Sequence, residues 1–153
     1  MHRCAFGLVA VLGLAGCGTT FAPQYDQTLY DHLSAASGGV HNIAAAAHLA
    51  ALPPSTYPAH EAQYVSILGD LRAADAIAKN RADQLKDKPS GKAASLISQM
   101  IEGCEDTVQT VIDQHKSTDG LPKGAFDPTP SVFEQNCDIP LKAESKLQEL
   151  AAH

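Results

Sequence analysis

The sequence predicts an all-α protein, folded as an antiparallel up-and-down bundle of four helices. Alanine is abundant, tryptophan is absent, and β-branched residues do not alternate with polar ones over any long stretch. Apolar residues instead recur at steps of three and four in four stretches, which segments containing proline or glycine separate. Because the connections between the first three stretches are short, those helices are expected to be antiparallel neighbours. The folded domain is predicted to span residues 26–153.

The first helix is predicted to begin near Asp26 and to end at Leu52-Pro53-Pro54-Ser55, because the residue before a proline disfavours helical backbone. The pair Gly38-Gly39 weakens its middle by up to about 1 kcal/mol per glycine, which favours a bend there. The second helix is predicted from about Ala59 to Lys86, with a seam of coiled-coil character. The inward positions are Leu29, Leu33, Ala36, Val40, Ile43, Ala47 and Ala50 in the first helix and Tyr64, Ile67, Leu71, Ala74, Ala78, Ala82 and Leu85 in the second.

Pro89-Ser90-Gly91 is predicted to be a turn in which Ser90 caps the third helix. That helix is expected to run to about Lys116. The segment Ser117–Pro130 contains three prolines and two glycines and is therefore predicted to be a loop. The inward positions of the third helix are Ala93, Ile97, Met100, Ile101, Cys104, Val108, Val111 and His115.

Ser131 and Glu134 have the spacing of a capping box, which predicts the start of the fourth helix. Pro140 removes a backbone donor from this helix, so the helix is expected to be kinked or split near Asp138 and Pro140. Its apolar side consists of Phe133, Cys137, Leu141, Leu147 and Leu150.

The N-terminus has the pattern of an export signal. A short basic start that contains Arg3 precedes an apolar run, Cys4–Leu14, which is too short to span a membrane. The run ends in Leu14-Ala15-Gly16-Cys17, which resembles the bacterial lipobox: a branched apolar residue, two small residues and the cysteine that receives diacylglycerol. The resemblance implies that residues 1–16 are a signal peptide, that Cys17 carries acyl chains such as palmitate in a lipid bilayer, and that residues 17–25 are a tether.

An ordinary secretory signal with an incidental Cys17 is the alternative, because small residues also precede that kind of cleavage site. The polar, flexible Gly18-Thr19-Thr20 after the cysteine favours lipidation. In the lipoprotein family of enteric-type bacteria, Asp at the position of Gly18 retains the protein at the inner membrane. The resemblance therefore implies a lipid-anchored location in the cell envelope, at the periplasmic face of the outer membrane.

Composition excludes some partners. Cleavage before Cys17 would leave 137 residues, in which 10 basic side chains face 17 acidic ones, for a net charge of −7. Nucleic acid and bare anionic lipid both favour positively charged partners, so neither is expected.

Two cysteines remain in the folded part, Cys104 and Cys137. An exported chain folds in an oxidising compartment, and their depths on neighbouring antiparallel helices are compatible, so they are predicted to form a disulfide. Two separate buried thiols are the alternative.

No metal, haem or other cofactor is predicted. The candidate ligands are His32, His41, His48, His60, His115 and His153. His41 and His48 share a helix face but lie about 10 Å apart along the axis, too far for one ion. Neither an i, i+4 histidine pair nor a Cys-x-x-Cys-His motif is present, so the histidines are expected to be solvated at the surface.

Two other groups of side chains invite a functional interpretation. An acidic stretch lies on the third helix, and it is expected to face water or a basic partner rather than a cation. Four tyrosines are expected to be half-buried packing residues at one end of the bundle. The acidic residues are Glu102, Glu105, Asp106 and Asp113, and the tyrosines are Tyr25, Tyr30, Tyr57 and Tyr64.

The sequence contains no nucleophile elbow, phosphate-binding loop or zinc-protease motif, so no enzyme is predicted. It is loosely similar to small helical-bundle lipoproteins with an opening Tyr-Asp helix, here Tyr25-Asp26, a similarity that implies no activity. The main hypothesis is a membrane-anchored, non-enzymatic module of the cell envelope that binds another protein or has a structural role. A bundle that binds a small ligand or metal in the periplasm is the alternative.

Overall fold

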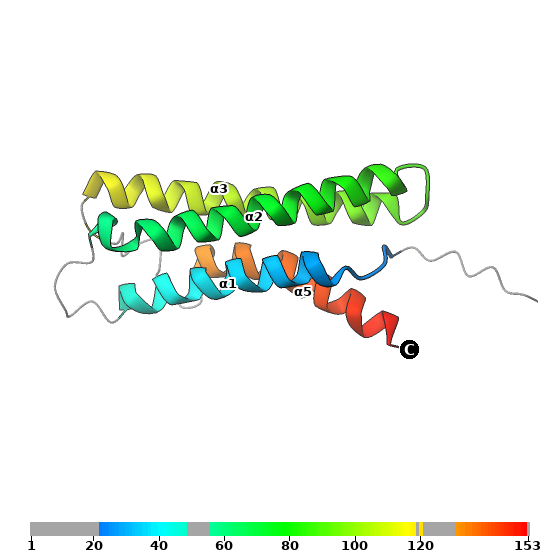
Figure 1. Ribbon diagram of the computed structural model, residues 1–153, viewed down its shortest axis with the longest axis horizontal. Coiled ribbons are helices and arrows are strands. Elements are labelled where there is room, and N and C mark those ends of the chain that lie inside the picture. Colours follow the sequence, from blue (N-terminus) through cyan, green and yellow to red (C-terminus); the bar gives the residue numbers. More distant parts are fainter. Residues whose placement is uncertain (1–21, 49–55, 119, 121–130, 153) are drawn as a thin grey trace, which may run out of the picture.

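The computed structural model describes residues 22–48, 56–118, 120 and 131–152. Four helices fill these segments: α1 (Gln27–His48), α2 (Tyr57–Leu85), α3 (Gly91–Thr118) and α5 (Val132–Ala151). Each helix packs against two neighbours, α1 against α2 and α5, and α3 against the same two (Figure 1). The predicted antiparallel four-helix bundle is thereby confirmed, with α2 and α5 diagonally opposite each other. The predicted signal peptide and Cys17 lie outside the described residues.

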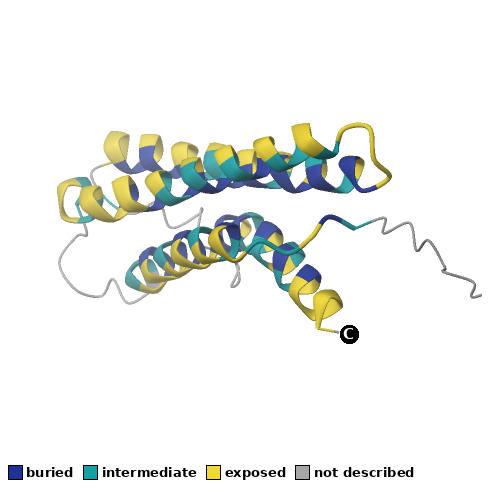
Figure 2. Ribbon diagram, turned by 45° about the vertical axis from the view of Figure 1, so that its right-hand side comes forward, coloured by how far each residue is buried: buried dark blue, intermediate teal, exposed yellow. Residues whose placement is uncertain are grey.

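The core follows a heptad pattern in all four helices, which is the spacing that keeps one side of a helix on a bundle axis. Figure 2 shows the buried positions on the inner sides of the helices and the exposed ones on the outer sides. The fully buried apolar side chains include Leu29, Leu33, Val40, Ile43, Tyr64, Ile67, Leu71, Ile101, Val108 and Phe133. Most predicted inward positions are buried; Leu150 is an exception at 58% exposure, and Ala94 is buried where Ala93 was predicted.

α1 continues as one helix through Gly38-Gly39. A Cβ atom at Gly39 would lie 2.6 Å from Cγ1 of Ile67, whereas a Cβ atom at Gly38 would meet nothing within 4 Å. Gly39 therefore allows the close approach of α1 and α2, and Gly38 has no such role.

Hydrogen bonds support the predicted starts of the first, third and fourth helices, whereas the second begins at Tyr57 and not near Ala59. The Asp26 carboxylate accepts a bond from the Leu29 amide at the start of α1 (3.0 Å). The Ser90 carbonyl accepts from the Ala94 amide at the start of α3 (3.0 Å). At the start of α5 both halves of the capping box are present, because Ser131 and Glu134 each accept a bond from the other's amide.

α5 is a single helix with Pro140 inside it, so the alternative of a split helix is wrong. Figure 1 shows its first half beside α1 and its second half turning away from the bundle, as a proline kink predicts. None of the described helices has an apolar stretch long enough to cross a membrane.

Candidate functional site

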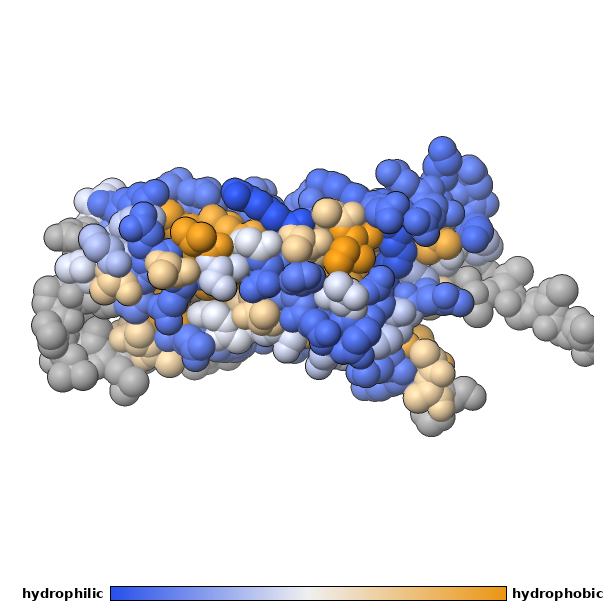
Figure 3. Space-filling view, in the orientation of Figure 1, coloured by the Kyte–Doolittle hydropathy of each residue, from blue (hydrophilic) through white to orange (hydrophobic). Residues whose placement is uncertain are grey.

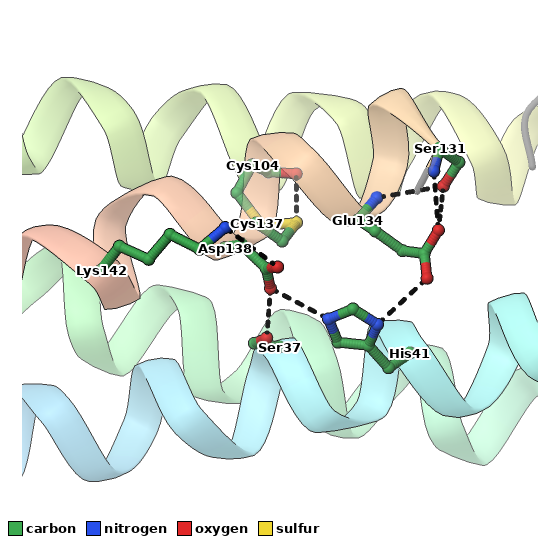
Figure 4. Close-up of polar contacts among 8 residues, drawn as sticks. All are labelled: Ser37, His41, Cys104, Ser131, Glu134, Cys137, Asp138 and Lys142. Carbon is green, nitrogen blue, oxygen red and sulfur yellow. Dashed lines mark hydrogen bonds and ion pairs between the residues drawn. A yellow bond between two sulfur atoms is a disulfide. The ribbon is translucent and has the colours of Figure 1, made fainter. Parts of the chain in front are cut away.

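The disulfide between Cys104 and Cys137 joins α3 to α5, with Cα atoms 4.7 Å apart (Figure 4). Both residues occupy inward heptad positions and are at most 2% exposed. The predicted pairing is confirmed. One polar bond supports the same contact, since the Asn136 amide group donates to the Thr107 hydroxyl (2.9 Å).

On the other side of α5, a cluster that we call the α1–α5 polar contact consists of Ser37, His41, Glu134 and Asp138. The His41 ring lies between the two carboxylates, with Nδ1 3.0 Å from Glu134 Oε1 and Nε2 3.0 Å from Asp138 Oδ1 (Figure 4). The Ser37 hydroxyl donates to the same Asp138 oxygen (2.7 Å). Because neutral imidazole carries one N–H, both carboxylates can accept a bond only from the protonated ring.

The two carboxyl groups are stabilised in their charged form. Partial burial by itself would raise the pKa of Glu134, but bonds from the Ser131 amide and hydroxyl and from His41 outweigh it and lower the pKa. Asp138 behaves in the same way: burial opposes ionisation, while Ser37, His41 and Lys142 lower its pKa below the usual value.

This geometry is not that of a nucleophilic triad or of a metal site. In a nucleophilic triad the serine donates to the imidazole, but Ser37 donates to Asp138. The two carboxylates contact opposite nitrogens of His41, so the three groups do not converge on one ion. No group of three or more His, Cys, Asp or Glu in the described segments could hold a metal ion. The α1–α5 polar contact is therefore a hydrogen-bonded link between two helices.

The lowered pKa values of Glu134 and Asp138 predict sensitivity to acid. A carboxyl whose pKa is lower in the folded protein stabilises the fold above its unfolded pKa of about 4, and this is lost as pH falls through the folded value. We expect the urea concentration at the unfolding midpoint to decrease when the pH is lowered below about 4. The decrease should be smaller in the variant Glu134→Gln/Asp138→Asn. Urea titrations at a series of pH values from neutral to acidic would measure the decrease for both proteins, and an equal decrease in the two would contradict the prediction.

A second polar cluster, the N-terminal clamp, lies at the other end of α1 and consists of Gln24, Asp26, Arg81 and Glu144. Arg81 Nη1 and Nη2 donate to the two oxygens of Glu144, each at 2.9 Å. Nη1 also donates to the Gln24 carbonyl (2.9 Å), and the Asp26 amide donates to Glu144 (2.8 Å). The Glu144 side chain is fully buried and that of Arg81 is 10% exposed, so the pair crosses the core between diagonal helices.

This clamp was not predicted from the sequence, although the heptad pattern contained a signal for it. Arg81 follows Ala74 and Ala78 at core spacing, and Glu144 follows Cys137 and Pro140 in the same way. Opposite charges at core positions of two helices indicate a buried ion pair, because a lone charge there would be very unfavourable. Ala82 and Leu141 were predicted to face inward in place of Arg81 and Glu144, so the ion pair was not predicted. Both Ala82 and Leu141 are only half-buried.

The prediction that the histidines are solvated is wrong for His115. Its side chain is fully buried at a core position of α3, and its Nδ1 lies 3.1 Å from the Tyr64 hydroxyl. His32 and His41 are half-exposed and contact carboxylates, His32 through Asp70 of α2 (3.0 Å). His60 lies 2.6 Å from Gln63. The His48 side chain and His153 lie outside the described part.

The four tyrosines do not gather at one end of the bundle. Tyr25 and Tyr30 contact each other near the start of α1, with ring centroids 6.0 Å apart. Tyr57 and Tyr64 stack near the start of α2, 6.1 Å apart, and the His115 ring lies 5.8 Å from each of them. Because α1 and α2 are antiparallel, the two pairs lie at opposite ends.

The acidic residues of α3 are partly engaged by α2. Glu102 pairs with Lys79 (2.8 Å) and Glu105 with Arg72 (3.0 Å). Asp113 accepts a bond from Gln109 on its own helix (3.0 Å). The basic partners of Glu102 and Glu105 are therefore residues of α2 in the same chain and not residues of another protein.

A cavity of about 530 Å³ lies beside the clamp, between the segment that leads into α1 and the end of α2. Its lining includes Gln24, Asn80, Arg81, Gln84 and Lys88. Ala22, Ile77 and Leu85 also line it, so the cavity is mixed in polarity, and it lies where the described chain begins.

No family model, curated protein or solved structure matches this chain.

Proposed function

We propose that the chain is a membrane-anchored lipoprotein of the bacterial cell envelope, and that its bundle is a non-enzymatic module that binds another protein. The lipobox-like Leu14-Ala15-Gly16-Cys17 supports the anchor. Gly18, at the position where Asp would retain a lipoprotein at the inner membrane, supports a location at the periplasmic face of the outer membrane. The outer face of α5 supports the binding role.

Among the described residues, three of the five exposed large apolar side chains lie on α5. They form what we call the α5 apolar line: Val132 (62% exposed), Ile139 (46%) and Leu150 (58%). At 100° per residue, steps of 7 and 18 residues place them within about 20° of one another around the helix, apart from the bend at Pro140. Single exposed apolar residues are ordinary, but a line of them along one helix is the pattern that a helix-binding partner recognises. On the face in Figure 3, hydrophobic side chains appear in several small patches separated by hydrophilic ones.

α5 is also linked to each of the other three helices. The disulfide ties it to α3, the α1–α5 polar contact ties it to α1, and the Arg81–Glu144 pair ties it to α2. A surface fixed in this way loses little conformational entropy when a partner binds. The observation that carries the proposal is this apolar line on a helix that is linked to all three others.

The anchor is tested by the variant Cys17→Ala. Several acyl chains, each CH₂ worth about 0.8 kcal/mol when buried, hold a protein to a bilayer where one chain does not. We expect wild-type chain from membranes to begin at Cys17 with an added acyl mass, and the variant to lose that mass and leave the membrane fraction. Mass spectrometry and fractionation measure both. Membrane attachment of a lipid-free chain would refute the anchor.

The binding role is tested by capture from native membranes with the lipidated chain as bait. The variant Val132→Ser/Ile139→Ser disrupts the α5 apolar line, and Val65→Ser on α2 (65% exposed) is the matched control. We expect a protein held by the wild type and by the control to be lost by the double variant. A partner that both variants retain equally would contradict a binding surface on α5.

A further inference from the structure

The length of chain before the bundle limits how far the domain can stand from a membrane. This inference rests on the proposed acylation of Cys17. Five Cα–Cα steps separate Cys17 from Ala22, the first described residue, and they reach at most about 18 Å. α2 alone, with 29 residues, is about 44 Å long. The end of the bundle that holds Ala22 is therefore close to the lipid headgroups, and the opposite end can lie much further away.

The turn between α2 and α3 lies at this same end. Figure 1 shows it beside the segment that leads into α1. The cavity beside the clamp is lined from both sides, by Ala22 and Gln24 of the incoming segment and by Lys88 and Ser90 of the turn. The N-terminal clamp fixes this arrangement, because Arg81 near the end of α2 holds the Gln24 carbonyl.

The turn concentrates positive charge on an acidic protein. Residues 86–92 contain three lysines, Lys86, Lys88 and Lys92, and one acidic residue, Asp87, for a net charge of +2, whereas the whole chain has −6. All three lysines are exposed. Asp83 is the next acidic residue before them.

The other end of the bundle differs in charge. There, residues 57–63 contain Glu61 and no lysine or arginine, and residues 113–118 contain Asp113 and Lys116. Lys116 lies over the Tyr57 ring, 4.8 Å from its centroid. The described part of that end therefore has no run of lysines like the one at 86–92.

We propose that Lys86, Lys88 and Lys92 contact the phosphate groups of anionic lipids in the bilayer that holds the chain, so that the bundle stands on its α2–α3 turn. Lysine side chains near an anionic surface are attracted to it over roughly one Debye length, about 8 Å at physiological salt. The net negative charge of the chain excludes recruitment of the free protein to an anionic bilayer. An acylated tether makes a net positive charge unnecessary, because it holds the turn at high local concentration beside the lipid. The orientation directs the first half of α5 away from the lipid.

Lysine labelling of the full acylated chain tests this orientation. The chain is placed in vesicles of phosphatidylglycerol, in vesicles of phosphatidylcholine and in detergent, and each sample is treated with an amine-acetylating reagent that does not cross membranes. Mass spectrometry then gives the labelling of each lysine and the acyl mass on Cys17. We expect labelling of Lys86, Lys88 and Lys92 to fall about fivefold in phosphatidylglycerol relative to detergent. Lys116 is the internal control and should change little.

The outcomes separate the two proposals. A missing acyl mass would refute the lipoprotein proposal. With the acyl mass present, two results would overturn the orientation and leave the anchor intact. One is labelling of the turn lysines that is the same in vesicles and in detergent, and the other is protection of Lys116 instead of the turn. Protection that is as strong in phosphatidylcholine, or that persists in molar salt, would overturn the contact with anionic headgroups. Lys79 lies seven residues before Lys86, about 10 Å along α2, and in the wild type it should be labelled less in phosphatidylglycerol than in phosphatidylcholine. The variant Lys86→Gln/Lys88→Gln/Lys92→Gln should reduce this difference and leave the acyl mass unchanged.

Discussion

Replacing Glu144 with leucine is expected to lower the free energy of unfolding by about 3–5 kcal/mol. The side chain is fully buried, and its carboxylate balances the charge of Arg81, which is itself 10% exposed. Removing the carboxylate leaves a guanidinium in the core and takes the acceptor from the Asp26 amide. Guanidinium chloride titration would measure the loss. A loss under about 1 kcal/mol, the range of surface pairs, would show that the clamp contributes little.

The double variant Arg81→Met/Glu144→Leu is expected to cost much less than the sum of the two single variants, because no buried charge remains without a partner. Arg81 Nε has no acceptor among the described residues, so the wild-type pair is itself imperfectly satisfied. Arg72→Met/Glu105→Leu provides the matched control. The Arg72–Glu105 contact is of similar length, 3.0 Å against 2.9 Å for Arg81–Glu144, but Arg72 is 66% exposed. Loss of the Arg72–Glu105 pair should therefore cost under about 1 kcal/mol.

Reducing the Cys104–Cys137 disulfide is expected to lower the free energy of unfolding by about 3–4 kcal/mol, because the bond closes a loop with a sequence separation of 33 residues. For a domain of this size the loss corresponds to about 10–15 °C in Tm. Calorimetry of oxidised and reduced wild-type chain measures it without a change of side chain.

The variant Cys104→Ala/Cys137→Ala separates the crosslink from packing. Both positions are buried, so the variant should be slightly less stable than the reduced wild type because it also loses two buried sulfur atoms. Reductant should leave its Tm unchanged. An identical Tm for oxidised and reduced wild type would contradict a stabilising role of the disulfide.

Much of the fold could be predicted because it depends on local patterns. The capping box at Ser131 and Glu134 involves neighbours in sequence, and the heptad spacing places Cys104 and Cys137 on inner faces without reference to other helices. The disulfide followed because each cysteine lies on such a face, at compatible depth.

The polar contacts between helices could not be predicted in the same way. Periodicity shows which residues share one helix face, but it does not show which edges of two helices meet. His41 was therefore predicted to be solvated, whereas in the structure Glu134 and Asp138 of α5 contact its two nitrogens. His115 was placed on the inner face, yet its partner Tyr64 lies 51 residues earlier, on a neighbouring helix. The diagonal pair of Arg81 and Glu144 depends in addition on the depth of two helices that are not neighbours.

The position of the disulfide also determines what a proteolytic cut would do. Cys104 precedes and Cys137 follows the whole connection between α3 and α5, residues 119–131. A cut anywhere in that connection would open the backbone but leave both fragments covalently joined, so α5 could not diffuse away from the other three helices. The oxidised chain can therefore survive a single cleavage there as a complete bundle, whereas the reduced chain would depend on non-covalent packing alone to retain its last helix.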